Sequence, residues 1–175
     1  MEIDLGLLVL RLALAALLAG HATQKLFGWF RGRGIQGTGK LFEADGLRPG
    51  AVMVTFAGLS ELAAAGLLAL GLATPLASAM VIGAMLAAIS TLWPKGLWAH
   101  LGGFEVPLTY AIIAFVLACT GPGAIAVDAL LPWQLHGPVW ALGAAVLGVL
   151  SAAPLLAMVV RHRRATREGS QPAAG

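Results

Sequence analysis

The sequence contains few charged residues, and over long stretches it has almost none. Only 11% of its 175 residues are Asp, Glu, Lys or Arg, whereas a soluble domain usually has about a quarter. Between Pro49 and Pro94 the only charged residue is Glu61, and between Val106 and Val160 the only one is Asp128. Stretches this poor in charge exclude the surface of a water-soluble domain and predict membrane-spanning helices.

Cysteine is nearly absent as well. Cys119 is the only one in the sequence, so the chain by itself cannot form an internal disulfide or carry out dithiol–disulfide exchange. No haem, flavin or iron–sulfur motif is visible, so the electrons for any redox reaction would have to come from a partner. The basic residues flank apolar segments instead of lining one soluble face. This pattern excludes a nucleic-acid partner and favours contact with membrane lipids.

Five apolar segments fit the length of a helix that crosses the hydrocarbon core, which takes about 20 residues. They cover residues 5–27, 51–72, 75–92, 104–118 and 138–160. We therefore predict an all-α integral membrane protein with a bundle of five transmembrane helices. In this prediction residues 1–164 form a single transmembrane domain, and residues 165–175 form a disordered cytoplasmic tail.

Small residues recur at a spacing of four in the third and fifth segments. Such rows allow the backbones of two helices to approach closely in lipid, so they predict tight helix packing. The residues are Ala79, Gly83 and Ala87, and Ala144 and Gly148.

The basic residues alternate between the links that join these segments. Five lie at the first link, one in the third and four after the last segment, whereas the second and fourth links and the N-terminal tail have none. Because cytoplasmic loops carry an excess of Lys and Arg, the N-terminus is predicted to lie outside and the C-terminus in the cytoplasm. We expect a multi-pass protein of a bacterial inner membrane.

The first link contains a glycine-rich stretch that matches a nucleotide-binding pattern. Gly32 to Gly37 reads G-x-G-x-x-G, but this motif binds dinucleotides only after a β-strand, and here a membrane helix precedes it. We interpret the stretch as a sharply turning loop at the membrane interface. Leu41, Phe42 and Leu47 favour a short interfacial helix after it.

Two charged residues fall inside predicted spans, Arg11 in the first and Glu61 in the second. A charged side chain in hydrocarbon costs several kcal/mol and marks a candidate functional site. From estimated depths, the two side chains are predicted to form a direct or water-bridged pair. A pair that only neutralises charge and sets the helix register is the alternative to a functional role.

A second polar group is expected near the cytoplasmic interface. His21 and Lys25 lie one helical turn apart, and together with Arg11 they form a polar stripe on the first helix. The third link, with His100 and nearby Glu105, shares their side of the membrane, so a cavity could collect these side chains. An ordinary amphipathic interface is the alternative. A metal site is not predicted, because His21 and His100 have no closely spaced partner ligand.

Several of these residues also carry a family resemblance. From about Leu7 to Leu131 the chain resembles the DoxX family. The similar positions are Arg11, Gly20, Lys25, the loop from Phe27 to Gly39, Glu61, Gly71 with Thr74, His100, and the stretch from Gly121 to Asp128. The resemblance implies a four-helix core, to which the fifth segment adds one C-terminal helix. It also implies a link to redox chemistry, because related proteins are described as membrane subunits of thiosulfate:quinone oxidoreductase and others as membrane anchors or accessory components.

These observations predict a membrane subunit of a redox complex that binds quinone and connects a partner oxidoreductase to the quinone pool. His21, Lys25 and His100 would donate hydrogen bonds to the quinone carbonyls, and Glu61 would supply protons. Arg11 completes the set of candidate site residues. The alternatives are a non-catalytic accessory subunit packed against a larger respiratory complex, and a small-solute transporter, against which the lack of internal repeats argues.

Overall fold

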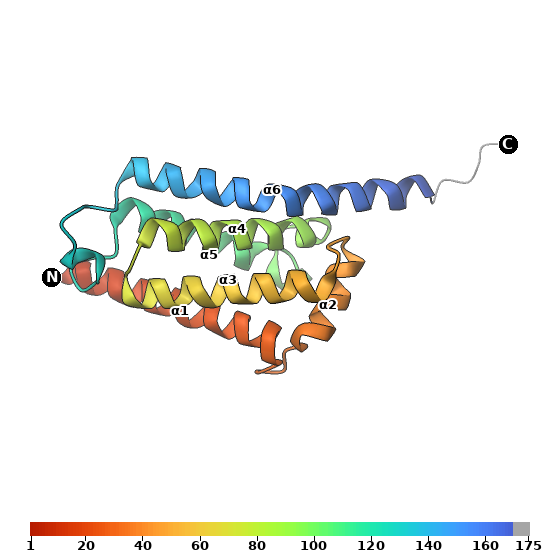
Figure 1. Cartoon of the computed structure of the whole chain (residues 1–175), viewed down its shortest axis with the longest axis horizontal. Helices are drawn as coiled ribbons and strands as arrows, with labels where there is room; N and C mark the ends of the chain where they lie inside the picture. Colours follow the sequence, from red (N-terminus) through yellow and green to blue (C-terminus); the bar gives the residue numbers. More distant parts are fainter. Residues whose placement is uncertain (170–175) are drawn as a thin grey trace.

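The protein is a bundle of long helices in a computed structural model, which describes residues 1–169. The helices α1, α3, α4 and α6 lie side by side in that order, and α5 lies behind and packs against α4 and α6 (Figure 1). The short helix α2 crosses one end of the bundle. The elements are α1 (Glu2–Phe27), α2 (Gly34–Ala44), α3 (Gly50–Leu70), α4 (Thr74–Leu92), η1 (Trp93–Lys95), η2 (Ala99–Leu101), α5 (Glu105–Thr120), η3 (Asp128–Leu130) and α6 (Pro138–Gly169).

Four of the helices, α1, α3, α4 and α6, are long and apolar enough to cross a membrane by length and composition. A helix satisfies its own backbone hydrogen bonds, which a segment in hydrocarbon requires. The helix α5 is also apolar but has 16 residues, which is about 24 Å at 1.5 Å per residue. The structure therefore confirms an all-helical membrane protein with four to five candidate spans.

Close packing between α4 and α6 depends on the small residues that the sequence singled out. A Cβ on Gly83 would fall on Ser151 Oγ, and a Cβ on Gly148 would lie 2.7 Å from a side-chain carbon of Ile82. These contacts confirm that the rows of small residues mark a helix interface.

The central core is formed by Leu14, Leu18, Leu68 and Leu117, all at most 2% exposed.

Two segments differ from the sequence-based boundaries. The helix α6 continues to Gly169, so residues 165–169, which were expected in a disordered tail, are helical; residues 170–175 lie outside the described part. The glycine-rich stretch is only partly a loop, because α2 begins at Gly34. Glycine permits this helix to lie close to α3, since Gly39 sits against Gly50 and Ala51 at distances that leave little room for a side chain.

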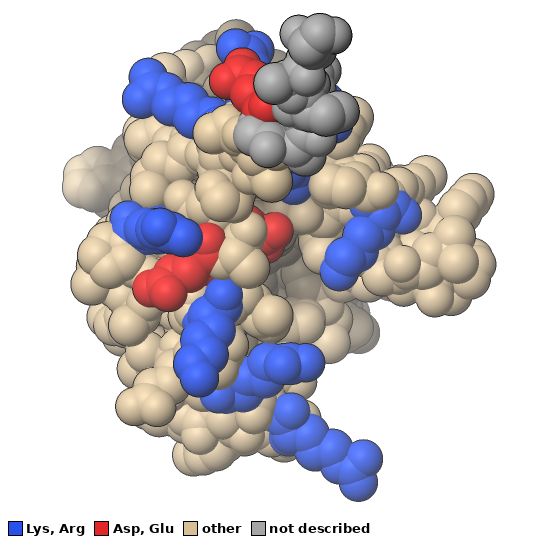
Figure 2. Space-filling model, turned by 90° about the vertical axis from the view of Figure 1, so that its right-hand side faces the viewer, with Lys and Arg blue, Asp and Glu red and all other residues tan. Residues whose placement is uncertain are grey.

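The two ends of the bundle differ in charge. The basic end, with α2 and the C-terminal part of α6, carries Lys and Arg side chains spread across its surface (Figure 2). The loop end contains Met1, the α3–α4 turn and residues 121–137 (Figure 1). The Lys and Arg residues at the basic end are Lys25, Arg31, Arg33, Lys40, Arg48, Lys95, Arg161, Arg163, Arg164 and Arg167.

The orientation in the membrane stays a prediction, and two exposed positions test it. In a Cys119→Ser background, we expect Leu130→Cys at the loop end to react with an impermeant maleimide in intact cells. Gln36→Cys in α2 should react only after permeabilisation, because Lys and Arg collect on the cytoplasmic side. The Cys119→Ser protein alone is the unlabelled control. The helices α3, α4 and α5 lie between positions 36 and 130, so the prediction places these positions on opposite sides of the membrane. Labelling of both cysteines in intact cells would contradict it.

Candidate functional site

Arg11 is buried at the loop end and does not contact Glu61. Its side chain is 3% exposed, and Nη2 donates a hydrogen bond to the carbonyl of Ile125. Nη1 lies where a Cβ on Gly71 would stand. Among the described residues, Nε and Nη1 have no hydrogen-bond partner. The predicted pair of Arg11 and Glu61 is therefore wrong.

The reason is the register of α1 against α3. The depth estimate assumed that both helices end at the same level on that side. Instead Arg11 lies level with Gly71, which ends α3, and Leu26 lies against Gly58. The first nine residues of α1, about 14 Å of helix, thus project beyond α3 at the loop end (Figure 1).

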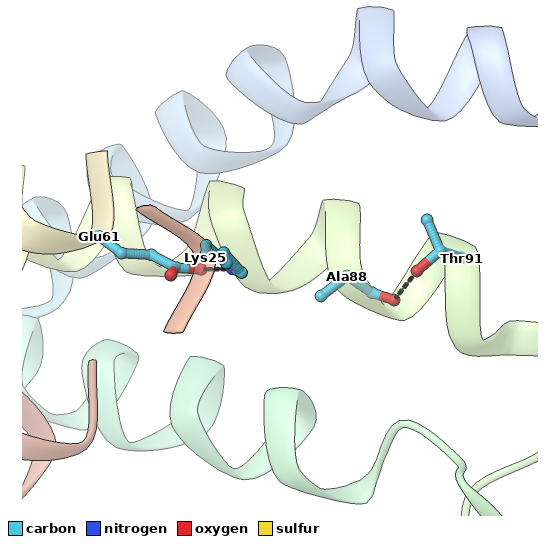
Figure 3. Close-up of polar contacts among 4 residues, drawn as sticks. All are labelled: Lys25, Glu61, Ala88 and Thr91. Atoms are coloured by element: carbon cyan, nitrogen blue, oxygen red, sulfur yellow. Dashed lines mark hydrogen bonds and ion pairs between the residues drawn. The ribbon is translucent and has the colours of Figure 1, made fainter. Parts of the chain in front are cut away.

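Glu61 pairs with Lys25 instead. Lys25 Nζ donates to Glu61 Oε1, joining the basic end of α1 to the middle of α3 (Figure 3). The glutamate side chain is 2% exposed and that of the lysine 23%. Glu61 Oε2 is buried and has no hydrogen-bond partner among the described residues. Such a group is expected to take a ligand or a water as its partner.

The Lys25–Glu61 pair lines a cavity of about 340 Å³ between α3, α4 and α6. The helix α4 packs against α3 on one side and α6 on the other, so its small residues form the floor of the cavity. Most of the other lining groups are apolar. The floor contains Ala79, Gly83, Ala84, Ala87 and Ala88, and the walls include Met53, Phe56 and Ala57 of α3, Phe42 of α2, and Leu147, Ser151 and Leu155 of α6.

Two of the predicted site residues lie elsewhere. His21 is exposed, and its ring packs edge-on against Tyr110 of α5 with centroids 5.9 Å apart. His100 is exposed in η2, and neither histidine lines the cavity. Glu105 accepts a hydrogen bond from the backbone of Ala99 at 2.9 Å, so it organises the third link. Within residues 1–169, no group of three His, Cys, Asp or Glu is placed to hold a metal ion.

Asp128, the other acidic residue of the apolar stretches, binds the turn between α3 and α4. Its carboxylate accepts hydrogen bonds from the backbone of Ala73 at 2.8 Å and of Thr74 at 2.9 Å, and from Thr74 Oγ1 at 2.7 Å. An acidic side chain at this place satisfies free N–H groups at the start of α4 and matches the helix dipole. Asp128 therefore ties the segment after α5 to the α3–α4 turn.

The cavity combines features suited to an amphipathic ligand. Its mostly apolar walls suit a hydrocarbon chain or ring, while Lys25 can donate a hydrogen bond and Glu61 can exchange a proton. The sequence signal for the floor was visible as the row of small residues in α4, but it predicted helix packing only. The contribution of α6 had no signal, because its lining residues lie far from Lys25 and Glu61 in sequence.

The comparison with family models gives one match. The model described as DoxX matches residues 6–101, more than half of the chain. The match includes Arg11, Lys25 and Glu61, and it confirms the resemblance seen in the sequence. It ends before α5 and α6. No curated protein and no solved structure matches the chain.

Proposed function

Because this chain belongs to the DoxX family of membrane proteins, we propose that it binds a quinone head group in the cavity between α3, α4 and α6. The supporting observation is a mostly apolar cavity lined by the partly buried Lys25–Glu61 pair, in which one oxygen of the buried carboxylate lacks a partner among the described residues. A quinone has the complementary chemistry, since it joins an apolar body to two carbonyl oxygens that accept hydrogen bonds.

In this proposal the chain supplies a hydrogen bond and a proton, and a partner oxidoreductase supplies the electrons. Lys25 Nζ donates a hydrogen bond to one quinone carbonyl. Reduction to the quinol takes two electrons from the partner and two protons. Glu61 in its protonated form delivers one proton to a carbonyl oxygen and becomes a carboxylate, and water at the basic end supplies the other proton. Lys25, at 23% exposure, connects the pair to water at the basic end, so Glu61 can be protonated again.

Binding to protein in quinone-free lipid nanodiscs tests the proposal. We expect decylubiquinone to bind the wild type, and we expect Glu61→Gln to weaken binding about tenfold, because a neutral amide replaces the ionisable carboxyl group that pairs with Lys25. The matched control is Lys40→Met, which removes a charge from the exposed surface of α2. Equal affinity of wild type and Glu61→Gln would contradict the proposal. A wild type that binds no quinone but co-purifies with respiratory subunits would support the accessory role instead.

A further inference from the structure

The charged side chains that line the cavity lie in one half of it, among apolar ones, whereas the other half is apolar. The antiparallel helices α3 and α4 are joined at Gly71–Ala73, so Glu61, ten residues before Gly71, lies about level with Ala84, ten residues after Thr74. Four polar side chains that line the cavity lie at this level or nearer the basic end. They are Lys25, Ser60, Glu61 and Thr91. Thr91 is displaced from the Lys25–Glu61 pair along α4 toward that end (Figure 3).

The half of the cavity toward the loop end is apolar. It is lined by Leu76, Ala79 and Met80 of α4 and by Leu147 of α6. Leu76 and Leu147 are each 49% exposed, so this half is open at the surface that faces lipid. Ser151, at the level of Gly83, marks the boundary, and its hydroxyl donates to the carbonyl of Gly148 at 2.8 Å.

Protein covers the polar half at the basic end except at Lys25, whose side chain is 23% exposed, and at Phe56, which is 69% exposed. Leu47 lines this half and is 2% exposed. Arg163 of α6 donates to the carbonyls of Ser90 at 2.8 Å and Thr91 at 3.1 Å, which fixes α6 to the last turn of α4. A chain that extends from the cavity along the bundle axis therefore meets Leu47 and the joined ends of α4 and α6 toward the basic end, and the exposed Leu76 and Leu147 in the other direction.

We propose that the ligand's head lies on the basic side of the Lys25–Glu61 pair and that its apolar tail leaves between Leu76 and Leu147 into the lipid. This inference rests on the proposed function and adds the orientation of the ligand. The volume of about 340 Å³ is near the lower limit for ligand sites, so it accommodates a head group and only the first part of a tail. Leu147 then determines whether a tailed ligand is accepted, although it lies outside the matched family region.

The test compares decylubiquinone with its tail-less head group, dimethoxy-methyl-benzoquinone, on the full chain in nanodiscs. We expect Leu147→Trp to lower the affinity for decylubiquinone by about tenfold, since contacts of one or two methylene groups have that effect. The affinity for the tail-less quinone should change by less than about twofold. The matched control is Leu150→Trp on the same helix, which is 64% exposed and does not line the cavity.

A second variant probes the polar half. Ala88→Phe fills the head-group space, so both quinones should lose affinity by about tenfold. If Leu147→Trp weakens both quinones equally or behaves like Leu150→Trp, the orientation is wrong while the proposed function stands. If Ala88→Phe affects only the tailed quinone, the ligand lies in the opposite direction. If neither quinone binds the wild type, the proposed function fails, and the orientation fails with it.

Discussion

Replacement of Lys25 by Met is expected to lower the free energy of unfolding by about 3 kcal/mol, because it leaves the carboxylate of Glu61 buried without a counter-charge. The glutamate is 2% exposed and has one oxygen that already lacks a partner. Thermal and denaturant unfolding in a mild detergent would measure the loss. Lys40→Met, on the exposed surface of α2, is the matched control and should change stability by less than about 0.5 kcal/mol.

The partner substitution should have a smaller effect. In Glu61→Gln the remaining Lys25, 23% exposed, can extend its ammonium group toward water at the basic end. The double variant Lys25→Met with Glu61→Gln should recover most of the stability lost in Lys25→Met, since no buried charge remains. Strictly additive effects of the two substitutions would show that the residues are not coupled. A stable double variant that no longer binds quinone would separate the role of the pair in binding from its role in folding.

Gly71→Ala is expected to destabilise the protein by about 3 kcal/mol, from two causes that add. Gly71 has φ +62°, in the left-handed region that favours glycine. In addition, its Cβ would occupy the position of Arg11 Nη1, so the buried guanidinium would have to move. The same unfolding measurements apply.

Gly66→Ala is the matched control for Gly71→Ala. It lies on the same helix, and a Cβ there meets nothing within 4 Å, so it should be neutral or stabilising by up to about 1 kcal/mol. Combining Gly71→Ala with Arg11→Ala separates the two causes. The double variant should lose less stability than the sum of the singles, because only the backbone strain remains in addition to the loss of Arg11. Equal stability of Gly71→Ala and the wild type would show that Arg11 is not held against this turn.

Two basic side chains of α1, the buried Arg11 and the partly buried Lys25, thus serve different ends of the protein. Arg11 joins α1 to the α3–α4 turn and to Ile125, at a place where Asp128 also binds the turn. Lys25 instead reaches Glu61 beside a cavity. Both places keep unpaired polar atoms among the described residues, Nε and Nη1 of Arg11 and Oε2 of Glu61. Only the Lys25–Glu61 pair lines a cavity, which makes it the better candidate for ligand binding.

The sequence by itself determined the class of this protein. Apolar stretches as long as those around Glu61 and Asp128 can cross lipid as helices, which satisfy their own backbone hydrogen bonds, so the helices followed from composition and length. The family resemblance followed from the order of residues such as Arg11, Lys25 and Glu61 along the chain. The row of small residues through Gly83 also predicted a helix interface correctly, because close backbone approach depends on residue size alone.

The tertiary structure alone decided which charges meet. Arg11 and Glu61 appeared to match in depth, but helical spacing carries no information about how far one helix slides along its neighbour. Packing of Leu26 against Gly58 sets that offset, and it places Lys25 beside Glu61 and Arg11 beside Gly71. The cavity likewise depends on α6, because Leu147 and Ser151 become neighbours of Glu61 only when α6 packs on α4. Partners so distant in sequence are brought together by side-chain packing, which no local pattern in the chain records.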